Sequence, residues 1–182
     1  MFTDLAHDLT QLAQANRDGF AFLLAYGLTW LAAAGLWKRF GPRVGAYAVL
    51  FQGIVALPIA FGLQALTSAG IRPDNPLLDQ LSTYLAVSQV FALPVIIYLI
   101  MVRKYRMTAL AFAIVTLVHF APYAWLYQTP LYLVLAGVLA IGLFVVCRLI
   151  DRNHTDDEDA TWAIPGFVGI VLAIGSIAAL VL

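Results

Sequence analysis

The chain has 182 residues, of which 63% are hydrophobic and 11% are charged, and its ten basic and ten acidic side chains leave no net charge. Soluble domains carry about 25% charged residues, so this composition, with a mean hydropathy of +0.90, excludes an aqueous globular fold. The balanced charge offers no basic field for nucleic acid, which we exclude as a partner. The sequence therefore predicts an all-α integral membrane protein with membrane lipid around it.

Residues 1–19 precede the first apolar stretch of membrane length. Leu5, Leu9 and Leu12 recur at helical spacing, and polar side chains occupy the opposite face. This pattern predicts a short amphipathic N-terminal helix that lies on the membrane interface or docks on the bundle. His7 is expected to be a solvated residue of the polar face.

Six later stretches reach the length of ~20 mainly apolar residues that a spanning helix needs. They cover about residues 20–37, 44–69, 82–102, 107–127, 130–148 and 162–182. Asn75-Pro76 and Thr129-Pro130 are typical helix starts, with a capping residue before a proline in the first turn. The connection between the fourth and fifth stretches is so short that these two helices should be antiparallel neighbours. We predict a single membrane domain of six transmembrane helices.

Eight of the ten basic residues fall in the first, third and fifth loops of this scheme. They are Lys38, Arg39, Arg43, Arg103, Lys104, Arg106, Arg148 and Arg152. Cytoplasmic loops of membrane proteins carry an excess of Lys and Arg. The distribution therefore predicts that these loops are cytoplasmic and that both termini lie outside.

No acidic residue falls inside the six predicted spans. Proton-coupled transporters and intramembrane hydrolases need carboxylates or His/Cys clusters there, so we predict no enzyme, no cofactor and no metal. The segment 151–159 is acidic and contains His154, but it lacks spaced metal ligands and is interpreted as a solvated loop. The single cysteine, Cys147, lies in an apolar run and is expected to serve packing.

One histidine, His119, lies inside the fourth predicted span. Thr116, His119 and Tyr123 are spaced to share one helical face, and Pro122 removes a backbone donor on the next turn. An ionisable side chain in a bilayer is costly, which makes it a hypothesis for a functional site. His119 is therefore the centre of the candidate site.

Other uncharged polar side chains are expected at a similar depth in neighbouring spans. Together with His119 they predict a polar ligand-binding pocket, open to the outside, lined by Tyr26, Gln64, Gln89, His119 and Tyr123. The pocket would bind or transport a small neutral or amphipathic molecule. The alternative is a structural or accessory membrane subunit, in which His119 makes interhelical hydrogen bonds that hold the bundle together.

Two further patterns concern packing. Pro58, Pro94 and Pro122 should bend spans two, three and four and favour a cavity among them. Small residues gather in spans one, five and six, where Gly169 and Ala173 form a small-xxx-small pair. Such faces allow close packing, either within the chain or onto a second copy or a partner membrane protein.

Three segments together resemble a family of small bacterial multi-pass membrane proteins known as domain of unknown function 7010. The segments are NRDGFAFLLAYGLTW at 16–30, NPLLDQLSTYLAVSQV at 75–90 and HFAPYAWLYQTPLY at 119–132. The third is the most specific, and the acidic segment 151–159 departs from the resemblance. The resemblance implies a bacterial cytoplasmic (inner) membrane location and supports the choice of His119, Pro122, Tyr123 and Gln89. It implies no activity.

Overall fold

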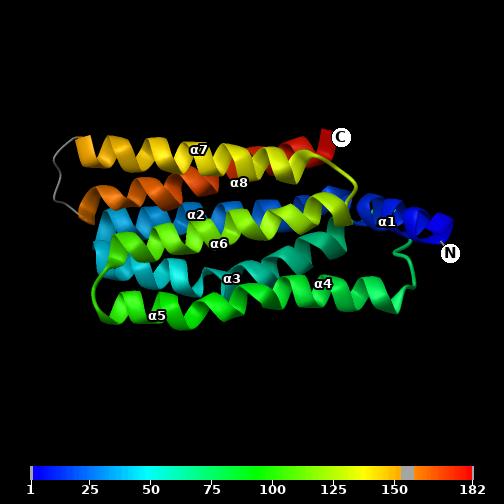
Figure 1. Cartoon of the computed structure of the whole chain (residues 1–182), viewed down its shortest axis with the longest axis horizontal. Helices are drawn as coiled ribbons and strands as arrows, with labels where there is room; N and C mark the ends of the chain where they lie inside the picture. Colours follow the sequence, from blue (N-terminus) through cyan, green and yellow to red (C-terminus); the bar gives the residue numbers. More distant parts are fainter. Residues whose placement is uncertain (1, 153–157, 182) are drawn as a thin grey trace.

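The computed structural model describes residues 2–152 and 158–181. Six helical segments long and apolar enough to cross a membrane run side by side along one axis (Figure 1). The described part contains helices and turns and no strand. The predicted all-α architecture with six spans is therefore confirmed.

The helices follow the predicted stretches closely. In chain order the elements are α1 (Phe2–Asn16), η1 (Arg17–Gly19), α2 (Phe20–Phe40), α3 (Pro42–Thr67), α4 (Pro76–Ser88), η2 (Gln89–Ala92), α5 (Leu93–Met101), α6 (Tyr105–Leu126), α7 (Leu131–Arg152), η3 (Glu158–Trp162) and α8 (Ala163–Val181). Asn75 caps α4 as predicted, because its side-chain oxygen accepts hydrogen bonds from Leu77 N and Leu78 N. α7 ends four residues later than predicted, at Arg152.

The third span is broken in the middle by the 3₁₀ turn η2. Pro94 stands in the first turn of α5 and has no backbone N–H to donate to Val90. In the tighter 3₁₀ turn, Leu93 N donates to Val90 O in place of the missing donor of Pro94, so this carbonyl keeps a hydrogen bond. The break thus follows from the proline, but it lies on the N-terminal side of Pro94 and includes Gln89.

The N-terminal helix α1 is amphipathic and docks on the bundle. Its apolar face is buried, with Leu9, Leu12 and Ala15 no more than 3% exposed, whereas His7 is exposed. Asn75 Nδ2 donates to Asp8 Oδ2 at 2.7 Å, and Ala69 N donates to Ala15 O at 3.2 Å. These bonds tie α1 to the connection between α3 and α4, so of the two predicted positions the docked one is observed.

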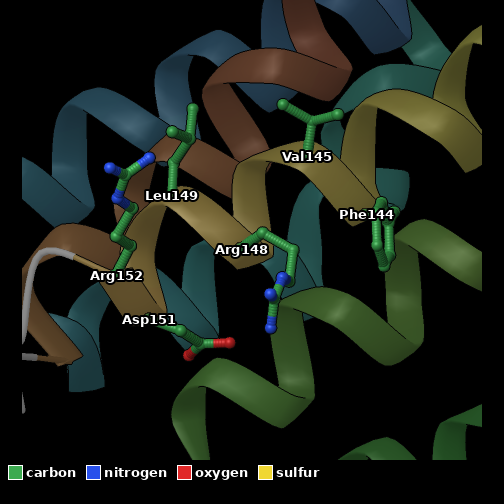
Figure 2. A pocket seen from close by; sticks show the side chains of 6 residues that line it. All are labelled: Phe144, Val145, Arg148, Leu149, Asp151 and Arg152. Atoms are coloured by element: carbon green, nitrogen blue, oxygen red, sulfur yellow. The ribbon is translucent and has the colours of Figure 1, made fainter.

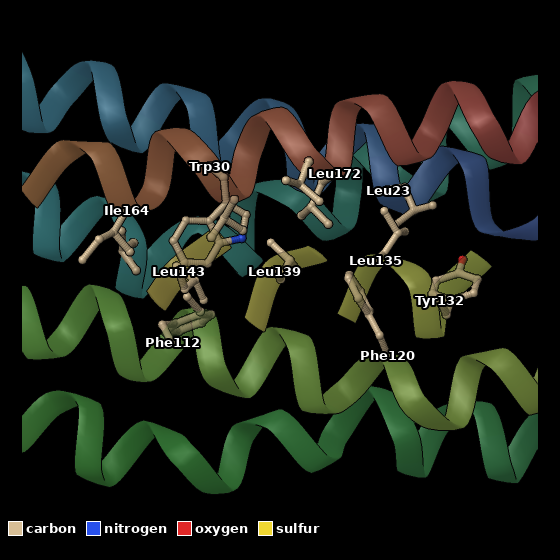
Figure 3. Close-up of a cluster of buried hydrophobic side chains, with 14 of the residues drawn as sticks. Leu23, Trp30, Phe112, Phe120, Tyr132, Leu135, Leu139, Leu143, Ile164 and Leu172 are labelled. Carbon is tan, nitrogen blue, oxygen red and sulfur yellow. The ribbon is translucent and has the colours of Figure 1, made fainter. Parts of the chain in front are cut away.

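α2 forms the centre of the bundle and packs against α3 and α8. Gly27 of α2 meets Gly169 and Ala173 of α8 so closely that a Cβ at Gly27 would lie 2.9 Å from Ala173 N. The predicted small-residue pair is therefore used inside the chain. Deeper in the bundle, apolar side chains from α2, α6, α7 and α8 converge on Trp30 (Figure 3).

The basic loops gather at one end of the bundle. The α2–α3 turn, the α5–α6 turn and the C-terminal end of α7 lie together there, whereas both chain termini lie at the other end (Figure 1). The eight basic residues of the odd-numbered loops thus share one end, as the count of six spans requires. We call this the basic end, and the other the terminal end.

Candidate functional site

His119 and Tyr123 share one face of α6, as their spacing predicts. Both side chains are half-buried, and their rings meet edge to face with centroids 4.9 Å apart. Thr116, one turn earlier, is buried and donates its hydroxyl to Phe112 O of its own helix. The polar face is therefore open only at His119 and Tyr123.

The side chain that meets His119 from the third span is Ser88. Its Oγ lies 3.5 Å from His119 Nδ1, and it donates to Leu85 O at 2.7 Å. Gln89, the residue expected there, is half-buried, and its side chain makes no hydrogen bond to any residue that the structure describes. Sequence reasoning missed Ser88, which lies where α4 gives way to η2.

Three tyrosines stack at the terminal end of α6 and α7. The rings of Tyr123, Tyr127 and Tyr132 lie 5.6 to 5.9 Å from one another, and Phe120 meets Tyr132 edge to face. The Tyr132 hydroxyl donates to Asp18 O at 2.7 Å, which fastens the cluster to the α1–α2 junction. Tyr127 and Tyr132 lie on either side of the short α6–α7 turn. Because so short a turn brings its two ends together, the contact between these tyrosines could have been predicted from the sequence.

Gln64 has a structural partner on α1. Its Nε2 donates to Asn16 Oδ1, and Asn16 Nδ2 in turn donates to the Tyr127 hydroxyl at 3.5 Å. The chain of bonds joins α3, α1 and the end of α6. Gln64 thus reaches the tyrosines only through Asn16, a residue that sequence reasoning did not select.

Tyr26 comes from the central helix α2. Its hydroxyl faces Gly53 of α3, 3.8 Å from where a Cβ on that glycine would stand. Of the five predicted residues, His119 and Tyr123 are in direct contact, and Tyr26 packs against α3. Gln64 is joined to them through Asn16 and Tyr127, and Gln89 is adjacent in sequence to the serine that contacts His119.

A second group of polar side chains is buried between α2 and α3. Thr29 Oγ1 donates to Tyr26 O at 3.0 Å and lies 3.5 Å from Gln52 Oε1. Gln52 is 3% exposed, and its Nε2 has no hydrogen-bond partner in the described part of the chain. The indole N–H of the fully buried Trp30 has none there either. This group lies in the interior of the protein and is separate from the His119 site.

Among the described residues, no three His, Cys, Asp or Glu side chains lie together as a metal site would require. Asp151, the first acidic residue of segment 151–159, pairs with Arg106 at 2.7 Å. His154, Asp156 and Asp157 lie outside the described residues. The chemistry available at the candidate site is therefore hydrogen bonding and ring contact with uncharged groups.

Comparison with known proteins supports the resemblance seen in the sequence. A family of unknown function, DUF7010, matches residues 8–182, which is almost the whole chain. No curated protein and no solved structure matches it. The match includes all six spans, the His119 segment and the docked part of α1. The chain therefore belongs to the DUF7010 family of unknown function.

Proposed function

We propose that this protein is a non-enzymatic membrane protein that binds, or passes, a small neutral or amphipathic molecule where the third span breaks beside α6. His119 and Ser88 would bind the polar group of that molecule, with Tyr123 beneath it and Gln89 close by. The observation that carries the proposal is the unused hydrogen-bonding capacity of His119 and Gln89 at this level of the bundle.

A neutral imidazole offers one donor and one acceptor. The His119 imidazole has one polar contact, with Ser88 at 3.5 Å, which is at the limit for a hydrogen bond, and the Gln89 side chain has none to a described residue. Polar groups left unpaired in the hydrocarbon region cost free energy. A ligand with a hydroxyl, amide or ether group would satisfy them.

Access supports a ligand that arrives from the bilayer. In the third span only 11% of the most apolar stretch is buried, compared with 56% in the last span. Leu78 is the one buried side chain of α4. A loosely packed span beside a polar group offers a lateral route between the helices, which suits an amphipathic molecule better than an ion.

Charge supports a neutral ligand. The acidic residues Asp79 and Asp151 stand in the first turn of α4 and the last turn of α7, and each is paired with an arginine. Neither forms a contact with His119. Without a charged partner in the bundle, His119 suits hydrogen bonding better than proton relay or ion pairing.

The test uses a long-chain fatty alcohol that carries a photoreactive diazirine, with the protein in phosphatidylcholine nanodiscs. We expect crosslinks on residues 85–92 and 116–126, and we expect excess unlabelled alcohol to compete with the probe and reduce these crosslinks. His119→Ala should weaken this competition about fivefold, which corresponds to one hydrogen bond of ~1 kcal/mol. Tyr84→Phe, an exposed change on α4, is the matched control and should have no effect. Labelling spread evenly over all lipid-facing helices, and unchanged in His119→Ala, would contradict the proposal.

The alternative, a structural or accessory subunit, is favoured by a different observation. Asn16, Gln64 and Tyr127 form a bonded chain that joins three helices, as interhelical hydrogen bonds in stable membrane proteins do. Thermal melting separates the two proposals at His119. A His119→Ala protein that melts like the wild type but loses the alcohol supports binding, whereas one that melts several degrees lower and retains the alcohol supports the structural role.

A further inference from the structure

The C-terminal end of α7 carries a pocket far from His119, at the basic end of the bundle. Its volume is about 460 Å³, and its lining comes from the last three turns of this one helix (Figure 2). The lining residues are Phe144, Val145, Arg148, Leu149, Asp151 and Arg152. It is an open hollow on the outer face of the bundle, with polar side chains toward the helix end and apolar ones toward the membrane centre.

The polar part of the pocket has an excess of positive charge. Asp151 is held by Arg106, whose Nη1 lies 2.7 Å from Asp151 Oδ1 and whose Nη2 donates to Cys147 O at 3.4 Å. Arg148 and Arg152 are exposed, and neither forms an ion pair with a described residue, although Arg148 feels the Asp151 charge at longer range. Since Arg106 neutralises Asp151, the positive charges of Arg148 and Arg152 are available to bind an anionic ligand.

The apolar part of the pocket points along the helix toward the membrane centre. Val145 and Leu149 are 46% and 54% exposed, and Ile141, one turn before Val145, is 70% exposed. With a rise of 1.5 Å per residue, Ile141 lies about 10 Å below Arg148. An exposed apolar stripe of this length next to two guanidinium groups matches a molecule with an anionic head and a hydrocarbon tail.

We propose that this pocket binds an anionic glycerophospholipid, with its phosphate between Arg148 and Arg152 and one acyl chain along Leu149, Val145 and Ile141. Guanidinium groups bind phosphate through paired N–H donors, and the low dielectric of the membrane interface strengthens that attraction. Basic pockets at one membrane face are a recurrent form of lipid headgroup site. The other basic side chains of this end, including Arg103 and Lys104, would draw anionic lipid toward the pocket.

The experiment measures lipid binding by native mass spectrometry of the full chain in a neutral detergent. Dioleoyl phosphatidylglycerol and dioleoyl phosphatidylcholine share acyl chains and differ in net charge. We expect the wild-type protein to prefer phosphatidylglycerol about tenfold or more, as charge-assisted hydrogen bonds predict. The double variant Arg148→Gln/Arg152→Gln should lose this preference. Arg103→Gln/Lys104→Gln removes the same charge from the same end, outside the pocket, and should retain most of it.

Three results would overturn the proposal. Equal binding of the two lipids by the wild-type protein would show that Arg148 and Arg152 do not select an anionic headgroup. An equal loss in both double variants would indicate a general field without a site. Displacement of the lipid by millimolar inorganic phosphate would indicate a free-anion site, because phosphate lacks the apolar part.

A second variant keeps the test informative if the double variant does not fold. Leu149 is exposed, so Leu149→Glu leaves the core intact and places a carboxylate in the middle of the pocket. It should abolish the preference for phosphatidylglycerol while the melting temperature stays near that of the wild type. A Leu149→Glu protein that still prefers phosphatidylglycerol tenfold would contradict the proposed position of the phosphate.

Discussion

Gln64 of α3 donates a hydrogen bond to Asn16 of α1, 48 residues earlier in the sequence, and Asn16 in turn donates to the Tyr127 hydroxyl. The amide of Asn16 thereby uses its oxygen toward one span and its nitrogen toward another. Since both bonds leave α1 from its last residue, they fix the point at which the docked helix meets the first span.

We expect Asn16 and Gln64 to be energetically coupled. Asn16→Ala should destabilise the protein by about 1–3 kcal/mol, because it leaves two partly buried partners without a bond. Gln64→Ala should cost less, and the double variant should cost clearly less than the sum. Melting in detergent measures this cycle. Gln11→Ala, which breaks an exposed contact with His7 within α1, is the control and should have little effect. Strict additivity would show that the two amides do not interact.

Gly19 is expected to tolerate no side chain. Its φ of +80° lies in the left-handed region, and a Cβ would stand 2.0 Å from the Tyr132 hydroxyl. Gly19→Ala should therefore lower the free energy of unfolding by at least ~1–2 kcal/mol, the cost of backbone strain plus the displaced tyrosine.

Gly70 provides the matched control for this prediction. It has a φ of +83°, but nothing lies within 4 Å of its Cβ position, so Gly70→Ala should show the backbone strain alone. The difference between the two melting temperatures then reports the contact with Tyr132. Equal melting temperatures would argue against the close packing of Tyr132 on Gly19.

Replacement of Gln52 by leucine should stabilise the protein. Its Nε2 is buried and unpaired, and Thr29, which contacts its oxygen, already donates to Tyr26 O. Removing a buried amide without a full set of partners should stabilise the protein by about 1 kcal/mol in Gln52→Leu. The same change at the bonded Gln64 should destabilise. Melting curves of both leucine variants decide the prediction, and a large loss in Gln52→Leu would reveal an unrecognised partner at this depth.

Gly27 and Gly35 lie on the same helix and should respond in opposite directions to alanine. A Cβ at Gly27 meets the backbone of α8 at 2.9 Å, which only a displacement of α8 could relieve, whereas nothing lies within 4 Å of the Cβ position of Gly35. Gly27→Ala should cost about 1–3 kcal/mol as overpacking does. Gly35→Ala should gain about 0.5–1 kcal/mol through helix propensity. Melting temperatures measure both, and a tolerated Gly27→Ala would refute close packing of α2 on α8.

The sequence predicted what depends on short-range order. Hydropathy gave the six spans, Asn75-Pro76 gave the start of α4, and helical spacing placed His119 beside Tyr123. The position of Gln89 could not be predicted in this way. Gln89 was selected for its expected depth, and Ser88 lies at nearly the same depth one residue earlier, so depth could not decide which of the two side chains faces His119.

Long-range partners were also beyond sequence reasoning. Asn16 and Tyr127 are 111 residues apart, and the Tyr132 hydroxyl reaches a backbone carbonyl, Asp18 O, which no side-chain pattern marks. Gln64 was selected for its expected depth in the membrane, and depth alone does not fix the rotation of a side chain about the helix axis. In the structure Gln64 donates to Asn16 of α1 and makes no hydrogen bond to His119.

The bonds of α1 have a consequence for the order of assembly during synthesis. This helix leaves the ribosome before the rest of the bundle, yet the side chains that hold it, Gln64, Asn75 and Tyr127, are translated later, the last of them 111 residues after Asn16. Its final contacts cannot form until the fourth span has emerged from the ribosome and inserted. Although α1 is translated before the bundle, it is thus among the last elements to reach its place, and ribosome-bound chains that stop before residue 127 should leave α1 open to protease.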